Sequence, residues 1–453
     1  RVYEWSSGSW TKLGADIDGE AAGDRSGWSV ALSSDGVILA VGATINSGTG
    51  SVAGHVRVYQ FSSGSWTQMG ADIDGEAAGD QSGRSVALSS DGTILAVGAV
   101  NNDGAGDAAG HVRVYQWSGG SWTQLGADID GEATLDQSGF SVSLSSDGTI
   151  LAVGAVGNDG SKGHVRVYQF SSGSWTQIGS DLDGEAASDQ FGISVALSGY
   201  GNRVGIGAKF NDGAGADAGH ARAFELVGRL PAPPPPVTYL ERGPMPASPS
   251  PPFSYGAITT ITQLGADIDG EAEHDYSGIS VALSSDGTIL AVGAEGNDDA
   301  GSGAGHVRVY QWDGSWTQLG ADIDGEAAND WSGGKTTVAL SHDGTILAVG
   351  AYDNDGTGSN AGHVRVYQWD GSWTQLGSDI DGEVAGDKSG YSVSLSADGT
   401  ILAVGAKNND GSGSNAGHVR VYQWDGSWGQ LGADINGEAA GDESGWSVAL
   451  SDD

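Results

Sequence analysis

The sequence contains no cysteine and few basic residues, and both deficits narrow what the protein can do. Without cysteine, the chain cannot form disulfides, zinc–thiolate sites or thiol nucleophiles. Lys and Arg total 19 against 58 Asp and Glu, which gives a net charge of −39. A charge of this sign repels nucleic acid and anionic membrane surfaces and attracts cations. Eight of the basic residues are one recurring arginine: Arg1, Arg57, Arg113, Arg166, Arg222, Arg308, Arg365 and Arg420.

Long apolar runs and helix signals are also missing. No apolar run approaches the ~18 residues of a membrane-spanning helix, so we expect no membrane insertion. Gly and β-branched residues interrupt every window that could form a helix. Proline is confined to one place, since all ten prolines lie between Pro231 and Pro252. The segment 227–255 is therefore predicted to be an insert, either a disordered or polyproline-like excursion or the product of a misannotated intron.

What the sequence does contain is one unit, repeated throughout. Each copy reads SVALSSDGTILAVGA, a polar Gly/Asn/Asp loop, AGHVRVYQW, a short turn, SWTQLG and an acidic loop of the type ADIDGEAAGD. The histidine of the HVRVY block recurs every 53 to 57 residues, except for a gap of 86 that contains the proline-rich insert. The seven histidines are His55, His111, His164, His220, His306, His363 and His418.

Each unit carries four short β-strand signals, and Asp-Gly turns join the first strand to the second and, in later copies, the third to the fourth. Four antiparallel strands repeated every ~55 residues indicate an all-β fold, a β-propeller whose blades bury their faces against one another. We expect a single propeller domain over residues 1–453. Seven units are complete, with a spare third and fourth strand at the start (1–13) and a spare first strand at the end (447–451). Seven blades are predicted; the alternative is eight, the last incomplete.

The strand order places the acidic loops and the Asn-Asp-Gly loops on the same face of the disc, because successive connections alternate between faces. The four recurring acidic positions of the eight acidic loops hold 31 of the 58 acidic residues. Such a density of carboxylates favours a hard cation, and Ca²⁺ takes six to eight oxygen ligands from flexible loops. The alternative is a solvated turn built on Asx hydrogen bonds. The candidate calcium ligands are Asp16, Asp18, Glu20, Asp24, Asp72, Asp74, Glu76, Asp80, Asp128, Asp130, Glu132, Asp136, Asp322, Asp324, Glu326 and Asp330.

Three further sets of recurring residues are interpreted as structural. The histidines lie in separate blades and are expected to make structural hydrogen bonds, and the arginines are expected to pair with a carboxylate of the same or the adjacent blade. The tryptophans of the SW blocks are expected to pack between blades.

A variable position before the first strand holds an aromatic residue in four copies. These aromatics could stack on a sugar ring at the acidic rim, and the alternative is that they pack inside the protein: Trp28, Phe140, Tyr391 and Trp446.

The repeat resembles the FG-GAP repeat of integrin α-subunit propellers and of many secreted or surface proteins. Phe191-Gly192 keeps the Phe-Gly dipeptide of the motif, whereas most copies have Ser-Gly. The second half of the FG-GAP motif is present as Val-Gly-Ala, for example at residues 97–99. The resemblance implies a seven-bladed propeller used in extracellular recognition or adhesion, often with calcium. In the family, calcium lies in the hairpin between strands one and two. Here that hairpin is only Ser89–Thr93, so any calcium must use the loops of the opposite face.

These observations predict a non-enzymatic binding or adhesion module, outside the cell or on its surface, that belongs to a larger protein. Its partner would be a protein or a glycan. No nucleophile motif of the GxSxG type is present, and near-identity between blades argues against a catalytic site, which needs one blade to differ. Two alternatives stay open. One is a carbohydrate-binding module or the propeller of a polysaccharide-active enzyme; the other is a purely architectural repeat.

Overall fold

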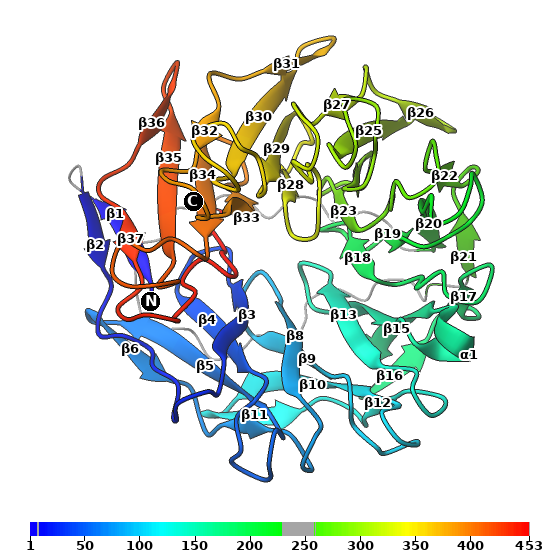
Figure 1. The fold of residues 1–453 in the computed structure, drawn as a ribbon. Helices are drawn as coiled ribbons and strands as arrows, with labels where there is room; N and C mark the ends of the chain where they lie inside the picture. Colours follow the sequence, from blue (N-terminus) through cyan, green and yellow to red (C-terminus); the bar gives the residue numbers. More distant parts are fainter. Residues whose placement is uncertain (7–8, 229–257, 259, 453) are drawn as a thin grey trace.

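A computed structural model describes residues 1–6, 9–228, 258 and 260–452. Seven sheets, each of four antiparallel strands plus one short strand, surround a central axis (Figure 1). The only helix among the described residues is the single turn α1 (Asn158–Ser161). No described helix is long and apolar enough to cross a membrane. The prediction of an all-β propeller with seven complete blades is confirmed.

The blades follow one another in chain order, with the first strand of each nearest the axis. Blade one consists of β3 (Ser26–Leu32), β4 (Ile38–Ala43), β5 (His55–Ser62) and β6 (Ser65–Gln68), and blade two of β8 (Ser82–Leu88), β9 (Ile94–Ala99), β10 (His111–Ser118) and β11 (Ser121–Gln124). Blade three consists of β13 (Ser138–Leu144), β14 (Ile150–Ala155), β15 (His164–Ser171) and β16 (Ser174–Gln177). Blade four consists of β18 (Ser194–Leu197), β19 (Arg203–Ala208), β20 (His220–Val227) and β21 (Thr260–Gln263). Blade five consists of β23 (Ser280–Leu283), β24 (Ile289–Ala294), β25 (His306–Trp312) and β26 (Trp316–Gln318). Blade six consists of β28 (Val338–Leu340), β29 (Ile346–Ala351), β30 (His363–Trp369) and β31 (Trp373–Gln375). Blade seven consists of β33 (Ser389–Leu395), β34 (Ile401–Ala406), β35 (His418–Trp424) and β36 (Trp428–Gln430).

The acidic loop contains a short strand that the sequence did not reveal. In blade one the loop folds back so that β7 (Ile73–Asp74) pairs with β5, with Asp74 opposite His55 and Ile73 opposite Val56. The corresponding strands are β12 (Ile129–Asp130), β17 (Leu182–Asp183), β22 (Ile268–Asp269), β27 (Ile323–Asp324), β32 (Ile380–Asp381) and β37 (Ile435–Asn436). This pairing anchors seven of the eight acidic loops against the third strand of their own blades; the loop of residues 15–24 contains no such strand.

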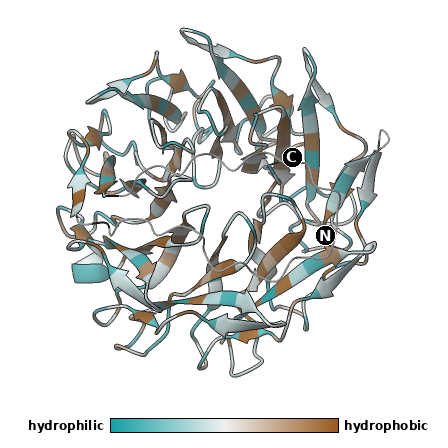
Figure 2. Ribbon diagram, turned by 180° about the vertical axis from the view of Figure 1, so that it is seen from behind, coloured by the Kyte–Doolittle hydropathy of each residue, from teal (hydrophilic) through white to brown (hydrophobic). Residues whose placement is uncertain are grey.

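The core lies between blades, where strand two is covered on both sides. Ile38 and Ala40 of β4 pack against Leu95 and Val97 of β9, and the same contact recurs around the ring. Hydrophobic residues accordingly concentrate on the strands (Figure 2). Because each fully buried aliphatic side chain contributes about 1.5–3 kcal/mol, every blade depends on its neighbours for stability.

Tryptophans and arginines tie neighbouring blades together. The indole N–H of Trp373 donates to the backbone oxygen of Leu319 in the preceding blade at 2.7 Å, and Trp428 and Trp175 make the equivalent bonds, which confirms the predicted packing between blades. The recurring arginine pairs with a carboxylate of the preceding acidic loop, as predicted: Arg113 lies 3.7 Å from Glu76, and Arg166, Arg308 and Arg365 make the equivalent ion pairs. Arg113 also donates to the backbone oxygen of Asp74 in the same loop.

The predicted insert lies outside the described residues, apart from Val227 and Gly228. Beyond it the blade resumes in register, with Phe224 opposite Gln263 as Tyr59 is opposite Gln68.

The spare segments from the two ends of the chain meet at an eighth position, between blade seven and blade one. The hairpin of β1 (Tyr3–Ser6) and β2 (Ser9–Lys12) supplies the third and fourth strands, and Trp10 packs on Gly432 of blade seven as Trp66 packs on Gly14. The C-terminal segment 447–451 takes the place of a first strand: Ser447 Oγ donates to the oxygen of Gly27 at 2.9 Å, as Ser29 Oγ does to Gly83 in blade one. Seven complete blades are thus joined by a partial unit in which the described residues form no second strand.

Candidate cation-binding face and channel mouth

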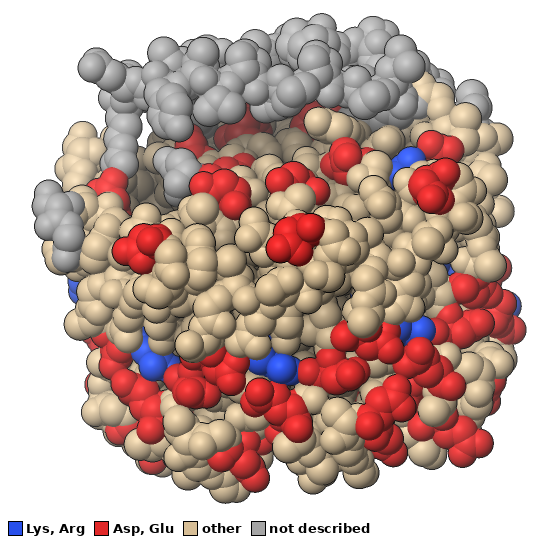
Figure 3. Space-filling view, turned by 90° about the horizontal axis from the view of Figure 1, so that it is seen from above, with Lys and Arg blue, Asp and Glu red and all other residues tan. Residues whose placement is uncertain are grey.

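Both families of Asp-rich loops lie on the same face, as the strand order predicts. The N–H of Gly75 in the acidic loop donates to Gly54, which ends the neighbouring polar loop, at 2.8 Å. The N–H of Asn101 in the next polar loop donates to Asp80 at 3.2 Å. From the side of the ring, Asp and Glu gather in a dense band toward one face (Figure 3). The acidic residues therefore form a continuous rim.

The fourth acidic position of each loop holds the loop itself together. The Oδ2 atom of Asp80 accepts the backbone N–H of Glu76 at 3.0 Å, that of Ala77 at 2.9 Å and the side-chain amide of Asn102 at 3.1 Å. Asp80 is buried. Among the candidate ligands, Asp24, Asp136 and Asp330 also accept backbone N–H groups of their own loops and are buried. These four carboxylates act in loop folding.

The other three acidic positions divide between two neighbouring blades. Around the Nδ1 atom of His55, a carboxylate oxygen of Glu20 lies at 3.7 Å, and oxygens of Asp72 and Asp74 lie at 4.0 Å each. Glu20 comes from the loop that enters blade one, whereas the two aspartates come from the loop that leaves it. Since β7 pairs with β5, Asp74 is held directly opposite His55. Each such group is called here a rim cluster.

The rim cluster recurs in every complete blade, except that Asn436 stands in place of the second aspartate at His418. The distance between His Nδ1 and the entering glutamate is 3.7 to 4.0 Å in all seven. Of the candidate ligands, Glu76, Asp128 and Asp130 gather at His111, Glu132 at His164, Asp322 and Asp324 at His306, and Glu326 at His363. At His306 the carboxylate of Asp299, from the polar loop, joins the group.

Two candidate ligands, Asp16 and Asp18, lie outside the rim clusters of the described histidines. The carboxylate of Asp16 bonds instead to Lys12 at 2.9 Å and to Arg1 at 3.1 Å. These partners lower the pKa of Asp16, with the Lys12 hydrogen bond as the largest cause. The backbone oxygen of Asp18 accepts a hydrogen bond from Arg57 at 2.6 Å.

The histidines are the functional candidates that sequence reasoning missed. Their side chains are at most 1% exposed. Among the described residues, the Nδ1 atoms of all but His164 have no hydrogen-bond partner, so the predicted structural hydrogen bond is not made there. The signal that could have identified them is the constant spacing between the histidine and the Asp-x-Asp of the loop that follows it.

Burial determines the protonation of these histidines. Removal from water, followed by the nearby Arg308 charge, lowers the pKa of His306 to about 3. Burial, followed by the charge of Arg222, lowers the pKa of His220 to about 4. The imidazoles are therefore neutral near pH 7, the form that offers a nitrogen lone pair to a metal ion. Burial, and then the charge of Asp72, raises the pKa of Asp74.

The variable aromatics form an arc on the side of the acidic loops, at the start of the innermost strands; we call this place the channel mouth. The ring centroids of Trp28 and Trp446 lie 5.0 Å apart, and those of Trp446 and Tyr391 lie 5.2 Å apart. Arg84 continues the arc, since its guanidinium carbon lies 5.4 Å from the ring of Trp28 and 4.6 Å from that of Phe140. All four aromatics predicted near the rim therefore lie in one arc.

Two lysines, Lys335 and Lys407, lie against the aromatic rings of this arc. The Nζ atom of Lys407 lies 3.6 Å from the centroid of Tyr391 and 4.2 Å from that of Trp446, and the Nζ atom of Lys335 lies 4.8 Å from that of Phe140. Burial, and then the charges of Arg84 and Lys209, lowers the pKa of Lys335 to about 8. An aromatic and basic surface thus lies inside the acidic rim, at positions that differ from blade to blade.

Comparison with known proteins supports the fold but names no family. No protein-family model matches the sequence, and no curated protein matches it. Among solved structures, Sqt1 from Chaetomium thermophilum has a TM-score of 0.55 at 15% identity, with 93% of this chain and 90% of that chain covered. Hydrazine synthase from Kuenenia stuttgartiensis has a TM-score of 0.53 at 13% identity, with coverage of 91% and 99%. At such identities the likeness establishes the propeller fold alone.

Proposed function

We propose that this chain is a non-catalytic binding module of the cell surface whose acidic face binds Ca²⁺ at the rim clusters. The observation that carries the proposal is the buried histidine nitrogen, without a hydrogen-bond partner, that faces three carboxylates from two successive loops. The approach of the entering glutamate to the histidine recurs in all seven complete blades, which argues against an accident of one loop. Membership of the FG-GAP family and a place in a larger surface protein are parts of the same proposal.

The spacing and chemistry of a rim cluster suit a divalent cation. Ligand atoms at 3.7 to 4.0 Å from the histidine nitrogen are too far for hydrogen bonds. A metal ion with bonds of ~2.0–2.6 Å can lie between them after a small contraction. Three carboxylates supply the hard oxygen ligands that Ca²⁺ prefers. The imidazole nitrogen makes Mn²⁺ and Zn²⁺ the tighter-binding probes.

Calorimetric titration of the metal-free protein with Ca²⁺, Mn²⁺ and Zn²⁺ tests this proposal. We expect saturable binding of each ion, with Zn²⁺ and Mn²⁺ tighter than Ca²⁺, and Glu132→Gln should remove one site. The matched control is Glu273→Gln, which neutralises an exposed acidic-loop residue outside the rim clusters and should leave the stoichiometry unchanged. Absence of binding heat, or an equal effect of the two variants, would contradict the proposal.

The ligand of such a module is proposed to be a protein or a glycan outside the cell. A Sqt1 structure of the same fold, with a TM-score of 0.54 at 16% identity, is described as bound to the N-terminus of the ribosomal protein L10. That complex supports a recognition role for a propeller face without indicating which ligand this chain takes. With Ca²⁺ bound, the acidic rim would carry less negative charge. The rim would surround the channel mouth and so restrict which ligands reach the aromatic arc.

The second candidate function is glycan binding at the channel mouth, favoured by the arc of Trp28, Trp446 and Tyr391. Stacked aromatic faces beside Lys407 and Arg84 suit a sugar that carries a carboxylate or a sulfate. Trp446→Ala should weaken binding to an acidic-glycan array at least ~10-fold, in line with about 1.4 kcal/mol per decade. The control Trp369→Ala removes an aromatic from an outer hairpin and should not change the signal. Equal signals from the two variants would rule this candidate out.

A further inference from the structure

The polar loop of blade five carries a carboxylate at a position where five other blades have glycine. In those blades the side-chain oxygen of the loop asparagine accepts the backbone N–H of a glycine two residues later, at 2.8 Å. These glycines are Gly48, Gly104, Gly213, Gly356 and Gly411. In blade five Asn297 accepts the backbone N–H of Asp299 instead, at 3.0 Å. Asp299 therefore occupies the glycine position of this loop.

The glycine position faces the rim cluster of its own blade. A Cβ added at Gly48 would lie 3.4 Å from Oδ1 of Asp74, and one added at Gly213 would lie 3.3 Å from Oδ1 of Asp269. Each of these aspartates lies opposite the recurring histidine of its blade. A side chain that leaves the backbone at this position is thus directed toward the cluster, to which a glycine contributes no ligand.

The group around the histidine of blade five accordingly has an additional acidic member. It consists of Glu271, Asp299, His306 and Asp322. One ligand atom from each of the four residues lies within 4.8 Å of those of the others. The carboxylate of Asp324 also lies 4.0 Å from the histidine Nδ1. Four carboxylates therefore gather at one imidazole, whereas three do so in blade one.

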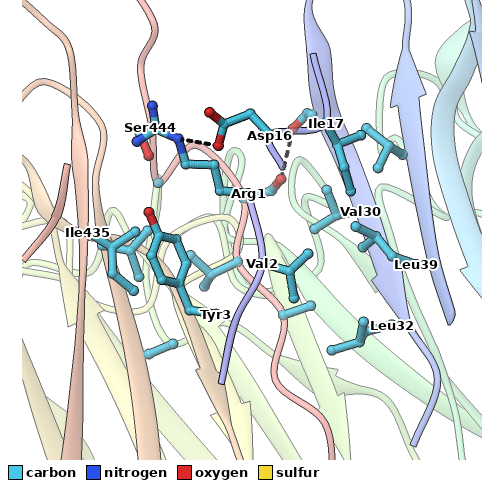
Figure 4. Close-up of a pocket in the computed structure, with 18 of the residues that line it drawn as sticks. Arg1, Val2, Tyr3, Asp16, Ile17, Val30, Leu32, Leu39, Ile435 and Ser444 are labelled. Carbon is cyan, nitrogen blue, oxygen red and sulfur yellow. Dashed lines mark hydrogen bonds and ion pairs between the residues drawn. The ribbon is translucent and has the colours of Figure 1, made fainter. Parts of the chain in front are cut away.

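No basic side chain compensates the charge of Asp299. Within the described part of the chain, its carboxylate accepts no hydrogen bond and forms no ion pair with Lys or Arg, and Arg308 lies instead 3.5 Å from Glu271. Asp16 shows the other arrangement, because its carboxylate bonds directly to Arg1 at 3.1 Å (Figure 4). Like charges that share a site repel one another, and a bound cation relieves that repulsion.

The imidazole of His306 is a second, independent indication of a ligand. Its side chain is 0% exposed, and neither ring nitrogen has a hydrogen-bond partner among the described residues. A buried polar atom without a partner costs about 1–3 kcal/mol. Its Nδ1 atom lies 3.8 Å from the carboxylate of Glu271, beyond hydrogen-bond distance. A metal ion bonded to Nδ1 satisfies the nitrogen and the carboxylates together.

We propose that this four-residue group is the highest-affinity metal site of the protein and binds one Zn²⁺ ion before the other rim clusters fill. The inference rests on the proposed cation binding at the rim clusters and adds to it an ion and an order of filling. Zn²⁺ takes imidazole nitrogen and carboxylate oxygen at ~2.0–2.2 Å in tetrahedral geometry, which places neighbouring ligand atoms ~3.3 Å apart. The separation of 3.8 Å between His306 and Glu271 has to close by only about 0.5 Å.

The ligand set also explains the choice of ion and the order of filling. Imidazole is a ligand that suits Zn²⁺, whereas Ca²⁺ takes oxygen ligands. Metal affinity rises with the number of charged ligands, and Asp299 adds one to the three found in blade one.

Titration of the metal-free 453-residue chain with Zn²⁺, in competition with a chromophoric chelator, tests the proposal. We expect one ion to bind at least ~10-fold more tightly than the others, because its site has an additional charged ligand. Asp299→Asn should remove this tight site and leave the weaker ones. The control Asp107→Asn neutralises an exposed carboxylate of the blade-two polar loop, outside the group at His111, and should leave the titration unchanged.

Gly48→Asp provides the converse test, since it adds the same carboxylate beside the cluster at His55. Gly48 does not have a positive φ, and its added Cβ would lie 3.1 Å from Oδ1 of Asn46, a contact that a shift of a few tenths of an ångström relieves. We expect two tight sites where the unchanged protein has one. The urea midpoint of the metal-free variant verifies that it is folded.

The possible failures of this inference and of the proposed function are distinguishable. Absence of Zn²⁺ binding would overturn both. Binding at seven equal sites would overturn the inference and leave cation binding at the rim clusters intact. A tight site that survives Asp299→Asn, or a folded Gly48→Asp protein with a single tight site, would show that Asp299 is not a ligand.

Discussion

Addition of Mn²⁺, Zn²⁺ or Ca²⁺ to the metal-free protein is expected to raise its thermal midpoint by about 20 °C when all seven rim clusters fill. A site held at one hundred times its dissociation constant adds about 2.7 kcal/mol to the free energy of unfolding. With an unfolding entropy of ~2.1 cal/mol/K per residue, a chain of this length gains roughly 1 °C per kcal/mol. Each filled cluster therefore contributes about 3 °C, in a scan read by tryptophan fluorescence.

The control has to show that the rise in the thermal midpoint comes from binding of the metal ion at the rim clusters and not from screening of the negative charge. NaCl at matched ionic strength is the control, since screening acts through a Debye length of ~10 Å at 0.1 M without regard to the histidines. His111→Gln, which keeps a polar side chain at the rim, should reduce the metal-dependent rise by about one seventh. A rise that NaCl reproduces, or that His111→Gln leaves unchanged, would show that the rim is only solvated.

Asp80→Ala is expected to reduce the free energy of unfolding by about 4 kcal/mol, even with chelator present. Its Oδ2 accepts two backbone N–H groups and the amide of Asn102 in a buried place, and each buried donor left without a partner costs about 1–3 kcal/mol. The measurement is a urea titration with chelator, followed by intrinsic fluorescence.

Glu76→Gln is the matched control in the same loop. Its side chain is half-exposed, it lies 3.8 Å from His111 Nδ1, and neutralising it removes one repelling charge from the rim cluster. The urea midpoint of the metal-free Glu76→Gln protein should equal or exceed that of the unchanged protein. If Asp80→Ala and Glu76→Gln lose stability equally, the division of the acidic loop into structural and ligating positions is wrong.

The fold could be predicted because its determinants are local. The Asp-Gly hairpins, the alternation in SVALS and the constant period each follow from a few adjacent residues, and the short hairpin at Ser89–Thr93 behaves as expected. Its Asp91 accepts hydrogen bonds from Ser89 and Thr93 within the turn. The face that carries the acidic loops followed from strand order alone.

The grouping of the site residues could not be predicted in the same way. A single loop suggested that Asp72, Asp74, Glu76 and Asp80 act together, but they separate because β7 folds back onto β5. That pairing turns Asp72 and Asp74 toward His55, while Glu76 continues to His111 in the next blade. The glycine that follows Asp74 permits this course, since a Cβ at Gly75 would lie 2.1 Å from the backbone oxygen of Ala53.

Closure of the ring depends on contacts between residues more than four hundred positions apart. Ser447 meets Gly27, and Arg1 donates to the backbone oxygen of Asn436 as the other recurring arginines do to their own preceding loops. Counting repeats identified the spare strands but not their meeting place. Only the three-dimensional arrangement shows that they share one position.

The most direct test of the central claim is anomalous diffraction from crystals soaked in Mn²⁺. The account predicts one anomalous peak in each of the seven rim clusters, between the histidine Nδ1 and the carboxylate of the glutamate that enters the blade. Peaks only at exposed carboxylates, or ordered water without anomalous signal at all seven positions, would contradict it.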